Sequence, residues 1–255
     1  MECPHLSEAL CDNWDQHWAD FSEAAKNAPA TRYRERVCLR LLQVRSSGAG
    51  VRMLDIGSGT GGFAEQFCSR FPEARLLGLE ISKTGVELSA RRVPRAEFVQ
   101  RDLMAAPPND QQISFGATHA VCSEVLEHLD DPLTFLLNAK MYMAPNCRLV
   151  VTVPGGAPNR FDTYIGHRRH YSPADLQMLL ETAGFEVDLA TGVGFPFFNL
   201  YRVVTTWRGD RLKQDVSGPP SLAVRVGMAI FAVLFRLNLM SSGLQTVAVA
   251  RRRPD

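Results

Sequence analysis

The sequence lacks the features of membrane-spanning and nucleic-acid-binding proteins. Its most apolar segment, residues 226–235, lies between Arg225 and Arg236 and has half the roughly 20 residues that a transmembrane helix needs. Its 28 basic and 27 acidic residues nearly cancel, so no basic field attracts a nucleic acid. We therefore expect a soluble globular protein with no nucleic-acid partner.

The sequence also lacks cysteines at the Cys-x-x-Cys spacing, which argues against a zinc knuckle or a redox motif. Cys68 and Cys122 fall in apolar segments and are predicted to be buried, reduced thiols. The first residues, Met1–His5, carry neither the basic nor the apolar part of a secretory signal. These absences predict a reducing, cytoplasmic location.

What the sequence does contain is an alternation of short apolar strands and amphipathic helices. Strands are predicted over 51–56, 74–81, 96–100, 118–122, 147–153, 185–190 and 244–250, and helices over 63–71, 86–92 and 132–143. Ser172-Pro173-Ala174-Asp175 has the pattern of a further helix start. Short links between strands and helices require parallel pairing, while the last strand suits an antiparallel edge. The predicted fold class is α/β, with a doubly wound, mostly parallel, seven-stranded sheet.

A glycine-rich turn follows the first predicted strand. Gly57, Gly59 and Gly62 match the pattern Gly-x-Gly-x-x-Gly, which lets the backbone approach a ligand closely. Glu80, at the end of the second strand, is placed to bind two ribose hydroxyl groups. Nicotinamide-dependent enzymes and S-adenosylmethionine (SAM)-dependent methyltransferases share both features, so these features alone leave the cofactor open.

Asp55 distinguishes between the two possible cofactors. A carboxylate two residues before the first glycine would repel the pyrophosphate of a dinucleotide, whereas SAM carries a cationic sulfonium and an ammonium group. Asp102, after the third strand, could accept a hydrogen bond from the adenine amino group or serve only as a turn residue. The acidic loop therefore favours SAM.

The segment Val51–Gly61 resembles motif I of class I, Rossmann-like, SAM-dependent methyltransferases, and Cys122–Leu129 falls where a later motif of that family lies. The segment Gly166–Pro173 resembles bacterial members of the group. The resemblance covers about residues 50–190 and implies a SAM-binding core over 49–190. Helical spacing of apolar residues predicts two helices within 8–46, so we expect an N-terminal helical cap over 1–48 and an acceptor-side helical extension with the final strand over 191–255. The predicted cofactor-binding residues are Asp55, Gly57, Ser58, Gly59, Gly62, Glu80, Ile81, Asp102, Leu103 and Ser123.

Methyl transfer to a hydroxyl or phenol requires the removal of a proton, which a nearby histidine can take. The candidates for this catalytic base are His128, just past the fourth strand, and His167 and His170, in the loop after the fifth. Each could instead be a packing or surface histidine. The predicted reaction is O-methylation of a small-molecule acceptor, and the alternative is N-methylation, which needs less help from a base.

Glu124, Glu127 and His128 could hold a divalent metal, because residues i and i+3 share one face of a helical turn. His167 or His170 could add a ligand. The spacing resembles the metal site of quinone-pathway O-methyltransferases, in which a metal would lower the pKa of the acceptor. The same segment also resembles metal-free methyltransferases, so both alternatives stay open.

No motif in the sequence marks the residues that bind the methyl acceptor. Trp14, Trp18 and Tyr33 could fold over the cofactor, and the aromatic segment 195–201 could line an acceptor pocket, but both could equally be core. We expect segment 226–235 to form a buried helix. The alternatives for residues 222–240 are the surface of a homodimer and a helix that lies on a membrane.

Two other classes of protein remain possible. A nicotinamide-dependent oxidoreductase would share the glycine turn and Glu80, but Asp55 disfavours it and no catalytic Tyr-x-x-x-Lys pair is present. A protein that binds SAM without catalysing a reaction is the other, and the cluster Glu124–His128 argues against it.

Overall fold

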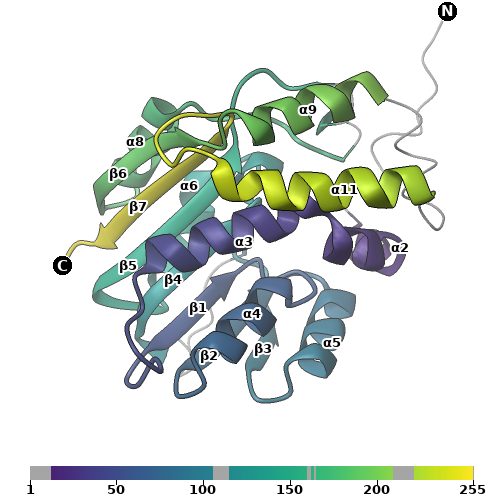
Figure 1. Cartoon of the computed structure of the whole chain (residues 1–255). Helices are drawn as coiled ribbons and strands as arrows, with labels where there is room; N and C mark the ends of the chain where they lie inside the picture. Colours follow the sequence, from purple (N-terminus) through teal and green to yellow (C-terminus); the bar gives the residue numbers. More distant parts are fainter. Residues whose placement is uncertain (1–12, 106–114, 160–161, 164, 209–220, 255) are drawn as a thin grey trace, which may run out of the picture.

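One seven-stranded sheet organises the molecule (Figure 1). The computed structural model describes residues 13–105, 115–159, 162–163, 165–208 and 221–254. The strands lie in the order β3-β2-β1-β4-β5-β7-β6. All pairs from β3 to β5 are parallel, whereas β7 runs antiparallel to both β5 and β6. The strands are β1 (Arg52–Ile56), β2 (Arg75–Glu80), β3 (Glu97–Gln100), β4 (Ala117–Ser123), β5 (Met143–Pro154), β6 (Phe185–Val193) and β7 (Gln245–Arg252). The predicted α/β fold is confirmed.

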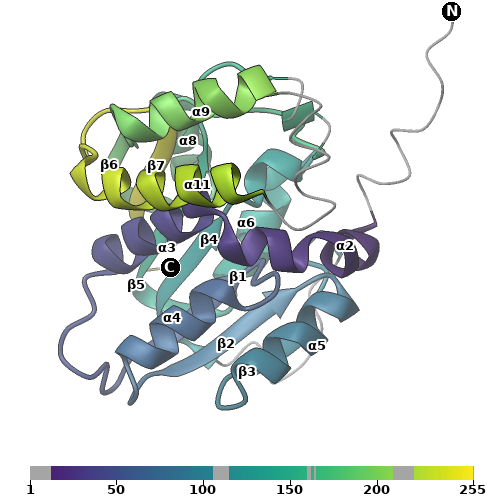
Figure 2. The ribbon, with the colours of Figure 1, turned by 45° about the vertical axis from the view of Figure 1, so that its right-hand side comes forward.

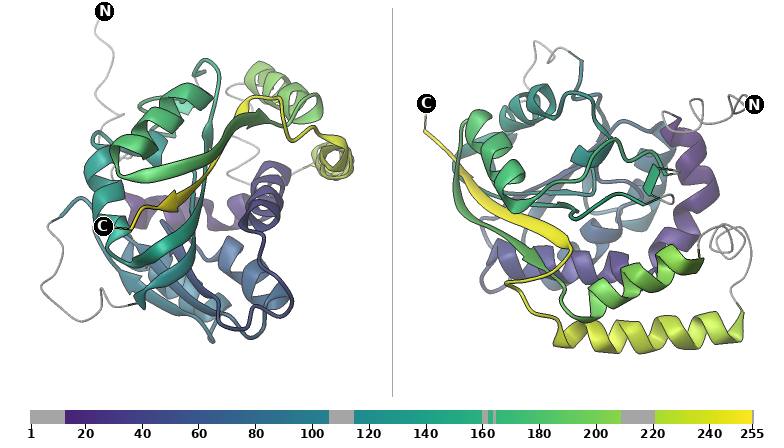
Figure 3. Two further views of the ribbon diagram at one scale, coloured as in Figure 1. Left: turned by 90° about the vertical axis from the view of Figure 1, so that its left-hand side faces the viewer. Right: turned by 90° about the horizontal axis from the view of Figure 1, so that it is seen from above.

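Helices cover both faces of the sheet (Figure 3). On one face lie α3 (Pro29–Leu42) and α4 (Gly62–Arg70), with α5 (Lys83–Arg92) beside α4, and on the other lie α6 (Pro132–Lys140) and α8 (Pro173–Thr182). Neighbouring residues of β1 point to opposite faces, because side chains alternate along a strand. Leu54 belongs to the α6–α8 core and Met53 to the α3–α4 core. Asp55 therefore projects on the same face as α3 and α4.

Several predicted boundaries need correction. The last strand, β7, is antiparallel as expected but lies inside the sheet, and β6 forms the edge. Its side chains from Gln245 to Ala250 are all buried, because strands cover both of its sides and helices or loops cover its faces. Although β7 belongs to the predicted C-terminal extension, it completes the core sheet. The helix predicted over 132–143 ends at Lys140, and Met143 already belongs to β5.

Two C-terminal helices, α9 (Phe197–Arg208) and α11 (Leu222–Leu234), follow β6; α11 lies along α3, and α9 packs against α11 (Figure 1). Phe198 and Phe235 pack with Tyr33 of α3 in a small separate core. The prediction that residues 226–235 form a buried helix is wrong. Helix α11 covers α3 with one face only, and Ile230 on its other face is 53% exposed.

At the N-terminus, α2 (Trp14–Asn27) and α3 form the predicted helical pair. Residues 1–12, with Cys3 and Cys11, lie outside the described residues. Cys68 and Cys122 are buried free thiols, as predicted, and so are Cys38 and Cys147. Among the described helices, none is both long and apolar enough to cross a bilayer.

Candidate active site

The glycine turn connects β1 to α4 at the carboxyl end of the sheet. The backbone amides of Gly57 and Ser58 both donate to the carbonyl of Leu79, at 2.8 and 3.1 Å, which ties the turn to β2. Gly57 has φ of 70°, and a Cβ there would lie 2.5 Å from a methyl group of Val125. Gly61 also has a left-handed backbone, with φ of 76°. Gly62, the third glycine of the predicted pattern, is already the first residue of α4. The turn therefore needs glycine for conformation and for close packing.

Glu80 ends β2 and is only 5% exposed. One of its carboxylate oxygens accepts from the amide of Gly59 at 2.8 Å, and the other accepts from the amide of Ser82 at 3.0 Å. Burial raises the pKa of Glu80, while these two amides act in the opposite direction. The carboxylate is thus held rigidly against the glycine turn.

Asp55 is the most perturbed acid beside the turn. It is 4% exposed, and its Oδ2 atom has no hydrogen-bond partner. Burial raises the pKa of Asp55 to about 8, and the negative charges of Glu80 and Glu35 add to the increase. Glu35 projects from α3 toward Gly62, and burial raises its pKa to about 6. Three carboxyl groups therefore surround one turn, and a cation is the ligand that would relieve their repulsion.

Glu35 was not among the predicted site residues. Its sequence surroundings do not indicate a role in the site, because a glutamate among the arginines of an amphipathic helix is typical of a solvent-exposed face. Only the packing of α3 on α4 brings it to the glycine turn, where it also accepts a hydrogen bond from Gln66.

Helix α2 covers this turn, next to the carboxyl end of β2 (Figure 2). The indole ring of Trp18 contacts Gly59, where a Cβ would lie 2.9 Å from the ring, and it also contacts Gly85. Asp15 fixes the helix, because its carboxylate accepts from the hydroxyl of Ser82 at 2.6 Å and from the amide of Thr84 at 2.8 Å. The predicted position of Trp18 over the cofactor loop agrees with this arrangement.

Helix α2 also reaches the predicted base. Trp14, one turn before Trp18, packs edge-on against His128 with 4.9 Å between ring centroids. The rings of Trp14 and Trp18 are 6.3 Å apart. Helix α2 therefore contacts the glycine turn through Trp18 and His128 through Trp14.

His128 ends the short 3-10 helix η2 (Leu126–His128). Its Nδ1 lies 3.2 Å from the carbonyl oxygen of Gly166. Because a carbonyl oxygen only accepts, Nδ1 carries the proton and Nε2 keeps a lone pair. Burial lowers the pKa of His128 to about 4, with smaller contributions from the charges of His17 and Arg168. The ring is therefore neutral at physiological pH.

His167 and His170 form a hydrogen-bonded pair beside it. His170 Nδ1 lies 3.1 Å from the carbonyl oxygen of Gly156, and its Nε2 lies 3.1 Å from His167 Nδ1. The carbonyl fixes the tautomer of His170, so His167 Nδ1 donates to it. Burial lowers the pKa of His167 to about 2, and the neighbouring histidines contribute to the shift. The centroids of the His128 and His167 rings are 4.8 Å apart, so the structure brings the predicted histidines together.

The predicted metal ligands are only partly together. Glu124 has φ of 58° and lies before the 3-10 turn that contains Glu127 and His128, so it does not share a helical face with them. Its carboxylate accepts from Gln245 at 2.8 Å and pairs with Arg34 at 3.5 Å. The ligand atoms of Glu127, His128 and His167 do lie within 4.8 Å of one another. A second such group consists of Asp162, His167 and His170.

Glu127 is fully buried, and neither of its carboxyl oxygens has a hydrogen-bond partner. Its Oε1 lies 4.0 Å from Nε2 of His167. Burial, followed by the charge of Glu124, raises the pKa of Glu127 well above its ordinary value. Its two unpartnered oxygens form an unsatisfied site, which a metal ion or a hydrogen-bonding ligand could fill.

The other predicted residues differ in their accessibility. Asp102 is exposed and accepts from the amide of Met104 at 2.8 Å, as a turn residue would. Leu103 is buried, Ile81 is 45% exposed, and the hydroxyl of Ser123 bonds that of Thr152. Tyr33, Phe198 and Tyr201 pack together with Phe231 and Phe235 as core.

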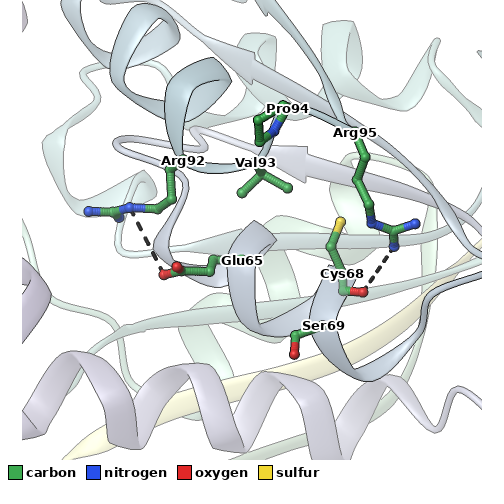
Figure 4. A pocket seen from close by; sticks show the side chains of 7 residues that line it. All are labelled: Glu65, Cys68, Ser69, Arg92, Val93, Pro94 and Arg95. Carbon is green, nitrogen blue, oxygen red and sulfur yellow. Dashed lines mark hydrogen bonds and ion pairs between the residues drawn. The ribbon is translucent and has the colours of Figure 1, made fainter.

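A hollow of about 360 Å³ lies elsewhere, between α4 and the end of α5 (Figure 4). Glu65, Cys68, Ser69, Arg92, Val93, Pro94 and Arg95 line it. None of these seven residues belongs to the predicted site. The glycine turn, by contrast, is filled by the ring of Trp18.

Comparisons with known proteins show the family of this chain. The family model of a methyltransferase domain matches residues 30–190. The O-methyltransferase rstn1 of Aspergillus nomiae is 30% identical over 167 residues, which are 60% of this chain and 72% of that protein. A probable SAM-dependent methyltransferase of Mycolicibacterium smegmatis is 30% identical over 165 residues, 63% of this chain and 61% of that protein.

A solved structure shows the same fold. It is that of phosphoethanolamine N-methyltransferase 2 of Haemonchus contortus, in complex with phosphomonomethylethanolamine and S-adenosylhomocysteine. It aligns with a TM-score of 0.63 at 18% identity, over 97% of this chain and 61% of that one.

The raised pKa of Asp55 predicts a pH-dependent stability. Between about pH 4 and about pH 8 the unfolded chain releases a proton that the folded chain keeps, so this group makes the folded state less stable as the pH rises. Asp55→Asn should remove that loss and stabilise the ligand-free protein near pH 8. Urea unfolding at about pH 5 and about pH 8 measures the effect.

The matched control is Glu97→Gln, which changes an exposed carboxylate on β3 and should follow the wild type. Parallel pH profiles for Asp55→Asn and the wild type would contradict the assignment of this buried acid.

Proposed function

This chain belongs to the methyltransferase-domain family of SAM-dependent enzymes, and we propose that it methylates an oxygen atom of a small-molecule acceptor, with His128 as the base. The single observation that carries the proposal is the hydrogen bond from Nδ1 of His128 to the carbonyl of Gly166, which leaves Nε2 unprotonated, in a ring that packs on helix α2, the helix that also covers the acidic glycine turn. The relative named as an O-methyltransferase supports oxygen as the acceptor atom.

The glycine turn fits SAM as its cofactor. When bound, SAM supplies a methyl group on a positively charged sulfonium. Asp55 and Glu80 offer buried negative charge to such a cation, and Asp55 Oδ2 is an acceptor with no partner of its own. We assign the binding of the ribose hydroxyls to Glu80. The remaining cofactor contacts are assigned to Gly57, Ser58, Gly59, Gly62, Ile81, Asp102, Leu103 and Ser123.

His128 is suited to take a proton from a hydroxyl group. The carbonyl of Gly166 fixes its tautomer, and burial keeps the ring neutral. A base of this kind contributes roughly 10²–10⁴-fold to the rate. His167 and His170 are positioning residues in this proposal, because their mutual hydrogen bond and the carbonyl of Gly156 hold the ring that packs against His128.

The same cluster fits a divalent cation. Glu127 has two unpartnered oxygens, and its ligand atoms lie within 4.8 Å of those of His128 and His167. A metal held there would supply Lewis acidity that lowers the pKa of the acceptor. This second candidate mechanism uses His128 as a ligand instead of a base, and it replaces the predicted Glu124 by His167.

Loss of the acidic groups should weaken cofactor binding. Asp55→Asn and Glu80→Gln should each raise the Kd for SAM at least about tenfold, because each removes a charged, buried hydrogen-bond acceptor. Isothermal titration calorimetry measures the Kd, and Glu97→Gln on β3 serves as the control with unchanged affinity. Unchanged affinity in both site variants would contradict the assignment of the pocket.

Loss of the base should affect turnover and not cofactor binding. We expect His128→Asn to lower kcat by about 10²–10⁴-fold while the Kd for S-adenosylhomocysteine stays unchanged. His119→Asn, which alters a half-buried histidine on β4, is the control and should keep its activity. The assay uses labelled SAM with a panel of phenols and alcohols.

The same assay separates the two mechanisms. Activity that survives dialysis against a chelator supports the base, and activity lost to the chelator and restored by a divalent ion supports the metal. If His128→Asn turns over at the wild-type rate, neither mechanism holds.

The ring of Trp18 must change its surroundings when SAM binds, because it contacts Gly59 within the proposed cofactor site. We expect S-adenosylhomocysteine to change the intrinsic tryptophan fluorescence, and Trp18→Phe to lose most of that change. Trp207→Phe is the control, since Trp207 is 88% exposed at the end of α9. A full signal in Trp18→Phe would show that the cofactor binds elsewhere.

A further inference from the structure

Helix α11 presents a continuous apolar stripe to solvent. Leu222, Val226, Ile230, Val233 and Leu237 are each at least 51% exposed. Their spacing of three or four residues places them on one side of the helix and of the turn that follows it. The opposite side of α11 packs on α3 and α9 through residues such as Phe231 and Phe235. Aliphatic residues this exposed along a whole helix are typical of a binding surface.

Both charged residues of segment 221–240 are positive. Arg225 and Arg236 are exposed and flank residues 226–235, and no acidic residue occurs between positions 221 and 240. Arg36 of α3 is close enough to Arg236 for their like charges to lower the pKa of Arg36. Within the described ranges, none of these three arginines pairs with a carboxylate.

We propose that α11 docks the protein on the surface of a membrane that contains anionic lipids. The aliphatic stripe would enter the boundary between headgroups and acyl chains, while the arginines contact lipid phosphates. The 13 residues of α11 span about 20 Å, which suits a helix lying in the plane of the surface rather than crossing it.

A second copy of the chain fits this face less well. In an antiparallel pair of α11 helices centred on the stripe, Arg225 of one copy would lie beside Arg236 of the other. In a parallel pair, no acidic residue of either helix would face an arginine. Neither arrangement neutralises the arginines, and the antiparallel one brings like charges together.

The proposed surface is connected to the histidine cluster. Helix α11 packs against α9, and Arg202 of α9 donates to the carbonyl of Gly155 and to Asp162, which lies 3.5 Å from His170. Helix α9 therefore links α11 to the cluster through Arg202 and Asp162. The docking itself does not depend on the proposed methyl transfer.

Flotation of the full chain with vesicles tests the proposal. The chain should float with vesicles of phosphatidylcholine and phosphatidylglycerol, and much less with phosphatidylcholine alone or at high salt. Ile230→Asp should reduce the bound fraction at least about tenfold, and Arg225→Gln with Arg236→Gln should reduce affinity about fivefold per arginine.

Met178→Asp is the matched control, because Met178 is an equally exposed aliphatic residue on α8, and it should float like the wild type. Circular dichroism and S-adenosylhomocysteine binding verify that each variant is folded. Wild-type protein that stays unbound, or Ile230→Asp that floats normally, would overturn the proposal. A wild-type dimer that Ile230→Asp dissociates, without vesicle binding, would assign the face to self-association instead.

Discussion

The proposed function depends on one electrostatic constraint, the crowding of buried carboxyl groups around the glycine turn. Asp55 is enclosed where strand β1 ends, and the charges of Glu80 and Glu35 oppose its ionisation. In the absence of a ligand the protein relieves this repulsion by keeping Asp55 protonated. A cation in the turn would relieve it in another way, by allowing the carboxylate to form. The site is thus acidic in composition and keeps a proton on Asp55 at rest, which distinguishes it from a site built for phosphates.

Helix α2 gives this site a cover. Asp15 anchors the helix at the start of α5, Trp18 fills the glycine turn and Trp14 touches His128. One helix therefore contacts both the proposed cofactor loop and the proposed base. Because the aromatic rings exclude water, they strengthen the desolvation that raises the pKa of Asp55 and lowers that of His128. The same cover must open or shift for a ligand to enter.

The sequence allowed the fold to be predicted almost completely, because seven strands with short links leave few topologies. The sequence also predicted that Gly57, Glu80 and Asp55 lie together at the carboxyl end of the parallel strands. It could not place Glu35, since the contact of α3 with the turn is long-range, nor foresee that the left-handed backbone of Glu124 separates it from His128. The prediction of a buried helix over residues 226–235 was wrong because an apolar sequence does not show whether one side of the helix or all sides are buried. The sequence could not predict that His128 and His167 pack together, because their contact depends on how the chain between β5 and α8 folds.

The proposed function requires that Asp55 lose its proton when the pocket binds a cation. Calorimetric titration of the protein with SAM near pH 7, in buffers that differ in their ionisation enthalpy, counts the protons exchanged on binding. The account predicts the release of about one proton in the wild type, because an acid with pKa about 8 must ionise, and none in Asp55→Asn. A binding enthalpy that is the same in every buffer for the wild type would contradict it.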